Sequence, residues 1–175
     1  MVENKAGQDA GNGKLKGAVI LGVFAVYMLC LLLITVIRPG RVLDERQLNL
    51  TPFADLINVF QYAELATFVW LFFGNIVWFI PFGFLFPVVI KRHSFWIALA
   101  SGFLLSLSIE TTQYVFRKGV AETDDVILNT LGAAIGYGLL RLFHLIYRKT
   151  RVVKDPDVMI ETLDIVEPPT QALGE

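Results

Sequence analysis

Residues 94–116 read SFWIALASGFLLSLSIETTQYVF, an apolar run with the basic triplet Lys91-Arg92-His93 before it and Arg117-Lys118 after it. A helix rises by about 1.5 Å per residue, so a run of this length crosses a hydrocarbon core of about 30 Å. The run carries one carboxylate, that of Glu110. It therefore predicts a membrane-spanning helix with an acid below the membrane surface.

Three further runs of similar character flank this one, and 55% of all residues are apolar. That share exceeds what a water-facing surface tolerates, so lipid must cover much of the protein. The sequence predicts an all-α fold, a small four-helix transmembrane bundle over residues 17–149. The four predicted spans are 17–37, 66–90, 94–116 and 125–147.

A short interfacial helix is expected after the first span. In Asn49-Leu50-Thr51-Pro52-Phe53, Thr51 suits the N-cap and Pro52 the first helical position. Apolar residues then recur at helical spacing, at Phe53, Leu56, Ile57 and Phe60. The pattern is typical of an amphipathic helix that lies on the membrane.

Both ends of the chain are polar: residues 1–16 are rich in Gly and Lys, and residues 150–175 are acidic with Pro168-Pro169. Such segments bury too little surface to fold, so both are predicted to be disordered. Lys and Arg favour the cytoplasmic side of a plasma membrane. With both termini in the cytoplasm, that side holds nine of them: Lys5, Lys14, Lys16, Lys91, Arg92, Arg148, Lys149, Arg151 and Lys154. The outer side then holds five: Arg38, Arg41, Arg46, Arg117 and Lys118.

Several classes of site are disfavoured. The charged residues are confined to the chain ends and to short segments between the apolar runs, which argues against a nucleic-acid-binding surface. Cys30 is the single cysteine, so one chain can build neither a disulfide framework nor a thiolate metal site. Four carboxylates could offer oxygen ligands to Mg²⁺ or Ca²⁺, those of Glu110, Glu122, Asp124 and Asp125. They lack the spacing of a known cation loop, so no metal and no cofactor is predicted.

Two polar stripes mark the third and fourth spans. Ser106, Glu110, Gln113 and Arg117 share one helix face, and Asp125, Asn129, Gly132 and Gly136 share another. Glu110 would lie about 10 Å below the outer surface and Asn129 about 6 Å, with Asn75 at a similar level. A carboxylate at that depth costs a few kcal/mol, on the order given by insertion scales, unless it has a partner.

The stripes predict an outward-opening polar pocket, with the loop around Arg46 as a lid. Its expected ligand-binding residues are Asn75, Glu110, Gln113, Arg117, Asp124, Asp125, Asn129 and Arg46. The alternative interpretation is that these groups only hold the helices together by hydrogen bonds. Asp124 and Asp125 would equally suit the first turn of the fourth helix. Gly132 and Gly136 indicate close helix packing.

Three motifs, in this order and spacing, resemble the VanZ-like family of bacterial membrane proteins. They are Asn49-Leu50-Thr51-Pro52-Phe53, Asn75-xxx-Phe79-x-Pro81-x-Gly83-xxx-Pro87, and Glu110-xx-Gln113 followed by Asp124-Asp125-xxx-Asn129-xx-Gly132. Members often carry Arg-xx-Asp-x-Asp-Asp before the Asn, whereas Gly119 and Glu122 occupy the first two places here. The resemblance implies a cell-envelope protein of the group named for a teicoplanin-resistance protein, and it implies no settled mechanism.

Two functions follow as hypotheses. In the first, the pocket binds an envelope lipid, a lipid-linked cell-wall precursor or a lipidated glycopeptide and modulates teicoplanin susceptibility. In the second, the protein is a membrane enzyme that modifies such a lipid, with Glu110 or Asp125 as general base and Arg117 stabilising negative charge. The first is favoured because the sequence has neither a nucleophile-elbow motif nor a His-metal motif. Transport through four helices would require an oligomer.

Overall fold

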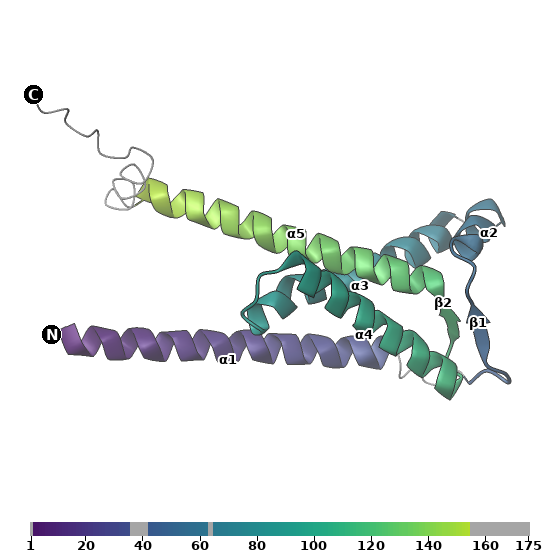
Figure 1. Ribbon diagram of the computed structural model, residues 1–175, viewed down its shortest axis with the longest axis horizontal. Coiled ribbons are helices and arrows are strands. Elements are labelled where there is room, and N and C mark those ends of the chain that lie inside the picture. The colour runs from purple at the N-terminus through teal and green to yellow at the C-terminus, as the bar shows by residue number, and fades with distance from the viewer. Residues whose placement is uncertain (1, 36–41, 63–64, 155–175) are drawn as a thin grey trace, which may run out of the picture. The chain divides into compact units, whose positions relative to one another are not determined.

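The computed structural model describes residues 2–35, 42–62 and 65–154, which form five helices and two short strands (Figure 1). Four of the helices are long and apolar enough to cross a membrane, which confirms the predicted all-α bundle of four spans. Their apolar segments are Gly13–Thr35, Leu65–Val89, Phe95–Phe116 and Thr123–Thr150. Each of them overlaps one of the four predicted spans.

The terminal helices are longer than predicted. Helix α1 covers Val2–Thr35 and α5 covers Thr123–Lys154. Residues 2–16 and 150–154 are thus helical, where the sequence predicts disorder. Neither stretch contains proline, and adding residues to an existing helix costs far less than starting a new one. The rest of the predicted tail, residues 155–175, lies outside the described residues.

Helices α1, α3 (Leu65–Val89) and α4 (Phe95–Phe116) share an apolar core. Leu31, Phe79 and Ile109, one from each helix, are buried against one another. The Tyr27 hydroxyl on α1 donates to the backbone carbonyl of Trp78 on α3 at 2.6 Å. In lipid this interhelical hydrogen bond adds to the van der Waals packing that holds the helices together.

Small residues bring α3 and α5 into backbone contact. A Cβ at Gly132 would collide with the carbonyl oxygen of Ile76 on α3, and a Cβ at Gly136 would collide with that of Ile80. A Cβ at Gly83 would collide with the carbonyl of Ala133. The close packing predicted for Gly132 and Gly136 is therefore confirmed, and Gly83 is its counterpart on α3.

Two short strands, which the sequence does not predict, join distant segments. Strand β1 (Gln47–Asn49) pairs in parallel with β2 (Val120–Glu122), in the register Gln47 with Val120 and Asn49 with Glu122. Figure 1 shows both strands beside the end of α4 and the start of α5. The pairing ties the segment after the first span to the connection between the last two.

The interfacial helix α2 covers Ala54–Tyr62 and begins later than its predicted cap. Phe53, not Thr51, precedes it, with a φ of 63° and with its carbonyl accepting from Ile57 N–H at 2.9 Å. The N–H of Phe53 donates to Oδ1 of Asp124 at 2.6 Å. A tertiary acceptor thus determines where the helix begins, and local preference at Thr51 and Pro52 does not.

Contacts along the chain divide it into two compact units, Met1–Gly138 and Leu139–Glu175. All residues of the site described below belong to the first unit.

Candidate functional site

The polar stripe of α4 is turned inward. Ser106, Glu110 and Gln113 are 0, 4 and 6% exposed, while Leu104 and Leu107 on the other side of the helix are exposed. Burying polar groups is costly unless they are hydrogen-bonded, so each of the three needs a partner. The structure supplies those partners from three different segments of the chain.

Glu110 is held by the strand pair. Its Oε2 accepts from the backbone N–H of Glu122 on β2 at 3.1 Å. One turn further, Gln113 Nε2 donates to the carbonyl of Thr35 at the end of α1, at 3.0 Å. The helix ends at Phe116, and its C-cap Arg117 has a φ of 56° and donates from Nη1 to the carbonyl of Asp44 at 3.2 Å. These polar residues therefore position the loops at this end of the bundle.

Ser106 and Asn129 join α4 to α5. Asn129 Nδ2 donates to Ser106 Oγ at 2.9 Å, and both side chains are buried. Neither residue lines a cavity among those found in the described part of the chain. For Asn129 the geometry matches the interpretation that polar groups hold helices together.

A double-mutant cycle should measure this pair. Ser106→Ala, Asn129→Ala and the double variant are expected to give a coupling energy of about 0.6 kcal/mol, the average for hydrogen bonds between membrane helices. Unfolding of the purified protein by SDS in mixed micelles provides the free energies. Additive effects of the two substitutions would show that the bond contributes nothing measurable.

A polar cavity of about 400 Å³ opens between α1, α3, α4, the start of α5 and the connecting segments. Asn75, Gln113 and Asp125, three of the predicted site residues, line it, and Asn75 Nδ2 donates to Asp125 Oδ1. Glu122, Trp70 and Trp78 line it as well. Carboxylates, amides and indole rings thus converge on one space.

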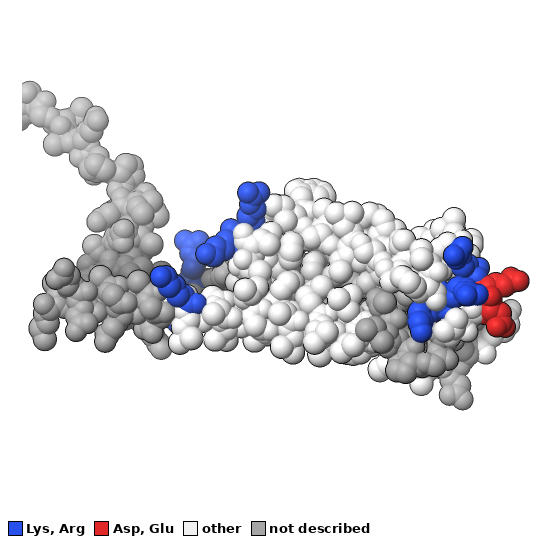
Figure 2. All heavy atoms as spheres, turned by 90° about the horizontal axis from the view of Figure 1, so that it is seen from below, with Lys and Arg blue, Asp and Glu red and all other residues white. Residues whose placement is uncertain are grey.

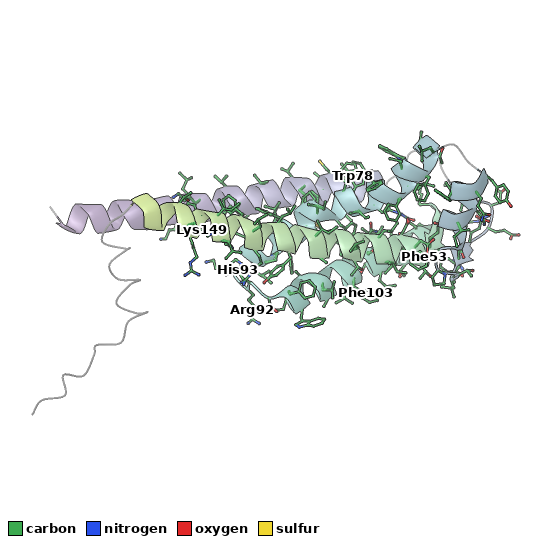
Figure 3. The ribbon with its side chains drawn as sticks, turned by 90° about the horizontal axis from the view of Figure 1, so that it is seen from above. Phe53, Trp78, Arg92, His93, Phe103 and Lys149 are labelled. Carbon is green, nitrogen blue, oxygen red and sulfur yellow. The ribbon has the colours of Figure 1, made fainter. Side chains whose placement is uncertain are left out.

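An apolar cavity of about 310 Å³ lies on the other side of β2. Leu48, Phe103 and Leu107 are among its walls, and the carboxylates of Glu110 and Glu122 belong to residues that line it as well. Phe103, labelled in Figure 3, lies on the exposed side of α4. Glu122 lines both cavities, so the two spaces adjoin at this one residue of β2.

Asp124 has a different task from its neighbour Asp125. It is 4% exposed, and its Oδ1 accepts from the N–H of Phe53, which Figure 3 shows near the start of α5. Its Oδ2 is buried and has no hydrogen-bond partner within the described chain. Asp124 therefore attaches the start of α2 to the first turn of α5.

The two predicted arginines lie at an outer, open hollow of about 720 Å³. Arg46 and Arg117 line it together with Asp44 and Glu45. Figure 2 shows acidic and basic side chains together at the end of the molecule where β1 and β2 lie. The Arg46 guanidinium carbon lies 6.0 Å from the centre of the Tyr114 ring, within the range of a cation–π contact. Since Tyr114 lines the apolar cavity, Arg46 lies beside that cavity.

Six of the eight predicted site residues thus line three separate spaces, while Asp124 and Asn129 line none of the cavities found in the described part of the chain. Glu122, Trp70 and Trp78 line the polar cavity and are not among the residues predicted for the site. Leu71, Asn75 and Trp78 follow i, i+4, i+7, so the face of Asn75 contained the signal for Trp78. In the residues that the structure describes, no group of three or more His, Cys, Asp or Glu could hold a metal ion.

The comparisons with known proteins concern this same region. The family model described as VanZ/LLP1 matches residues 24–144, well over half of the chain. The chain belongs to the VanZ/LLP1 family. Protein VanZ of Enterococcus faecium is 37% identical over 98 residues, which are 54% of this chain and 55% of that protein. The alignment thus spans about half the length of that relative. No solved structure matches the chain significantly.

The VanZ/LLP1 match includes every residue that lines the polar and the apolar cavity, since these run from Ile34 to Val126. The residues around both cavities therefore lie within the part of this chain that matches the family.

Proposed function

We propose that this VanZ/LLP1 membrane protein binds an amphiphilic component of the bacterial cell envelope and thereby modulates susceptibility to teicoplanin. The observation that carries the proposal is the pair of adjoining cavities, one apolar and one polar, that share Glu122. Cavities of a few hundred Å³, mainly apolar with a few convergent polar groups, are typical of small-molecule sites. A hydrocarbon chain suits the first cavity and a polar head suits the second.

The ligand is an envelope lipid, a lipid-linked cell-wall precursor or a lipidated glycopeptide. Each combines a hydrocarbon part with a hydrogen-bonding head, as the two cavities require. The charges support an outward orientation of this end, because nine Lys and Arg against five favour the opposite end as cytoplasmic. Lys91, Arg92 and His93 form the turn at that opposite end of α3 and α4, and Figure 3 labels two of them.

Binding is favoured over catalysis by the separation of the two candidate carboxylates. Glu110 lines the apolar cavity and Asp125 lines the polar one. A general acid and a general base must both reach the reacting atoms, which this distribution does not favour. Mass spectrometry of a labelled lipid-linked precursor incubated with the protein tests the point, and a product that depends on Asp125 would establish an enzyme.

Susceptibility of a teicoplanin-sensitive strain that expresses the protein tests the proposal. The wild-type chain is expected to raise the minimal inhibitory concentration of teicoplanin. Asp125→Asn and Glu110→Gln should return it to the level of cells without the gene, because each alters one cavity. Asp44→Asn, at an exposed residue of the outer loop, is the matched control and should behave as wild type.

Equal amounts of each variant in the membrane, measured by immunoblot, are required for this comparison. If both cavity variants protected cells as well as the wild type does, the cavities would not be the functional site.

A further inference from the structure

We infer that the polar cavity binds a protonated amine and selects against a phosphate, an inference that rests on the proposed binding of an amphiphile. The cavity is lined by the carboxylates of Asp125 and Glu122 and by the amides of Asn75 and Gln113. None of the described residues that line it is Lys or Arg. The lining therefore offers negative charge and hydrogen-bond acceptors to the head of the ligand.

The acid at the centre of this lining is pre-oriented. Asn75 Nδ2 donates to Oδ1 of Asp125, which fixes the plane of the carboxylate. Hydrogen bonds between an ionised carboxylate and an ammonium are about twice as strong as those between neutral groups. A phosphate in the same place would bring two negative charges together where water is partly excluded, which is strongly unfavourable.

Aromatic rings complete the site. Trp70 and Trp78 lie two turns apart on α3, and both line the polar cavity. Tryptophan is the best aromatic partner of a cation, since the face of its ring carries partial negative charge. Trp70 is 73% exposed and Trp78 is 37% exposed, so both are partly open residues of the cavity wall. Together with the two carboxylates they supply the kinds of group that bind organic ammonium ions.

The positive end of α5 does not reverse this preference. Thr123 begins the helix, and Asp124 and Asp125 occupy its first turn. Acidic residues at this position compensate the positive end of the helix dipole. A helix N-terminus that could attract a phosphate is therefore already faced by two acids of the chain itself.

Tryptophan fluorescence can follow binding at this cavity. The chain has three tryptophans, and the third, Trp96, lines none of the cavities found in the described part of the chain. Trp96→Phe in the full-length chain therefore leaves only the two cavity indoles as reporters. The purified protein in micelles is titrated with three probes that differ only in the head: octylammonium, octyl phosphate and octanol.

Octylammonium is expected to change the emission with an affinity at least about tenfold higher than that of octyl phosphate, the factor that a charge-assisted hydrogen bond provides. Asp125→Asn and Glu122→Gln should each lower the affinity for octylammonium by about tenfold. Both should leave octanol binding unchanged, which shows that the variants fold with an intact cavity. Asp44→Asn is the control and should change none of the three affinities.

Tighter or equal binding of octyl phosphate would overturn the inference, and so would octylammonium binding that neither acid variant weakens. If all three probes bound equally, the amphiphile proposal would stand and the charge preference would fail. If no probe changed the emission, both the cavity and the inference would be rejected, while the susceptibility assay would still decide the antibiotic effect.

Discussion

Replacement of Gly83 by alanine is expected to lower the free energy of unfolding by about 1–3 kcal/mol, the usual cost of overpacking. An added Cβ would lie 2.6 Å from the carbonyl carbon of Ala133 and 2.7 Å from its Cα. Those are backbone atoms of α5, which cannot move aside as a flexible side chain can. The two helices must separate, and the contacts around Gly132 and Gly136 are then weakened as well. SDS-induced unfolding in mixed micelles, followed by circular dichroism, measures the change.

Gly74→Ala is the matched control, because Gly74 lies on the same helix and an added Cβ there meets nothing within 4 Å. Alanine is favoured over glycine inside a helix by about 1 kcal/mol, so this variant should be as stable as the wild type or slightly more stable. Equal effects of the two substitutions would show that α3 and α5 do not approach as closely as described.

Asp124→Ala is expected to cost about 1–2 kcal/mol and to release the start of α2. The substitution removes the charge-assisted hydrogen bond to Phe53 N–H, which alone would cost about 1.5–3 kcal/mol. The loss is partly offset because the buried, unpartnered Oδ2 disappears with it. Phe53, which has a positive φ, should then relax. Unfolding in SDS measures the stability, and hydrogen exchange measures the protection of the α2 amides.

Asp124→Asn separates the acceptor from the charge. It retains an oxygen for Phe53 N–H, so the α2 amides should remain more protected than in Asp124→Ala. If exchange in α2 were the same in the wild type and in Asp124→Ala, the attachment of α2 to α5 would have no role in its stability.

Those parts of the fold that depend on local composition could be predicted from the sequence. An apolar run bounded by charges must span the membrane, so the limits of α3 and α4 agree with prediction within one or two residues. The inward face of α4 was predictable too, because Ser106, Glu110 and Gln113 follow helical spacing. Helical periodicity states which residues share a face.

Periodicity does not state which groups meet. Strands β1 and β2 have three residues each and lie far apart in the chain, so neither shows an alternating pattern. Asp124, the acceptor that determines the start of α2, is likewise far away in the sequence, 71 residues after Phe53. The backbone partner of Glu110 depends on β2, and the division into two cavities therefore depends on a strand that the sequence does not predict. Tertiary contacts between distant segments thus determine the strands, the start of α2 and the division into two cavities.

The parallel pairing of Gln47–Asn49 with Val120–Glu122 also constrains the order of events during synthesis. A growing chain is inserted span by span, yet the first of these segments must wait until more than seventy further residues have been made. Closing so long a loop is slow, and it comes after the first three spans are in place. A truncated chain that stops after α4 could thus be inserted but would lack both the partner for β1 and the backbone donor for Glu110. The two cavities that β2 borders can therefore form only after α4 and β2 have been made.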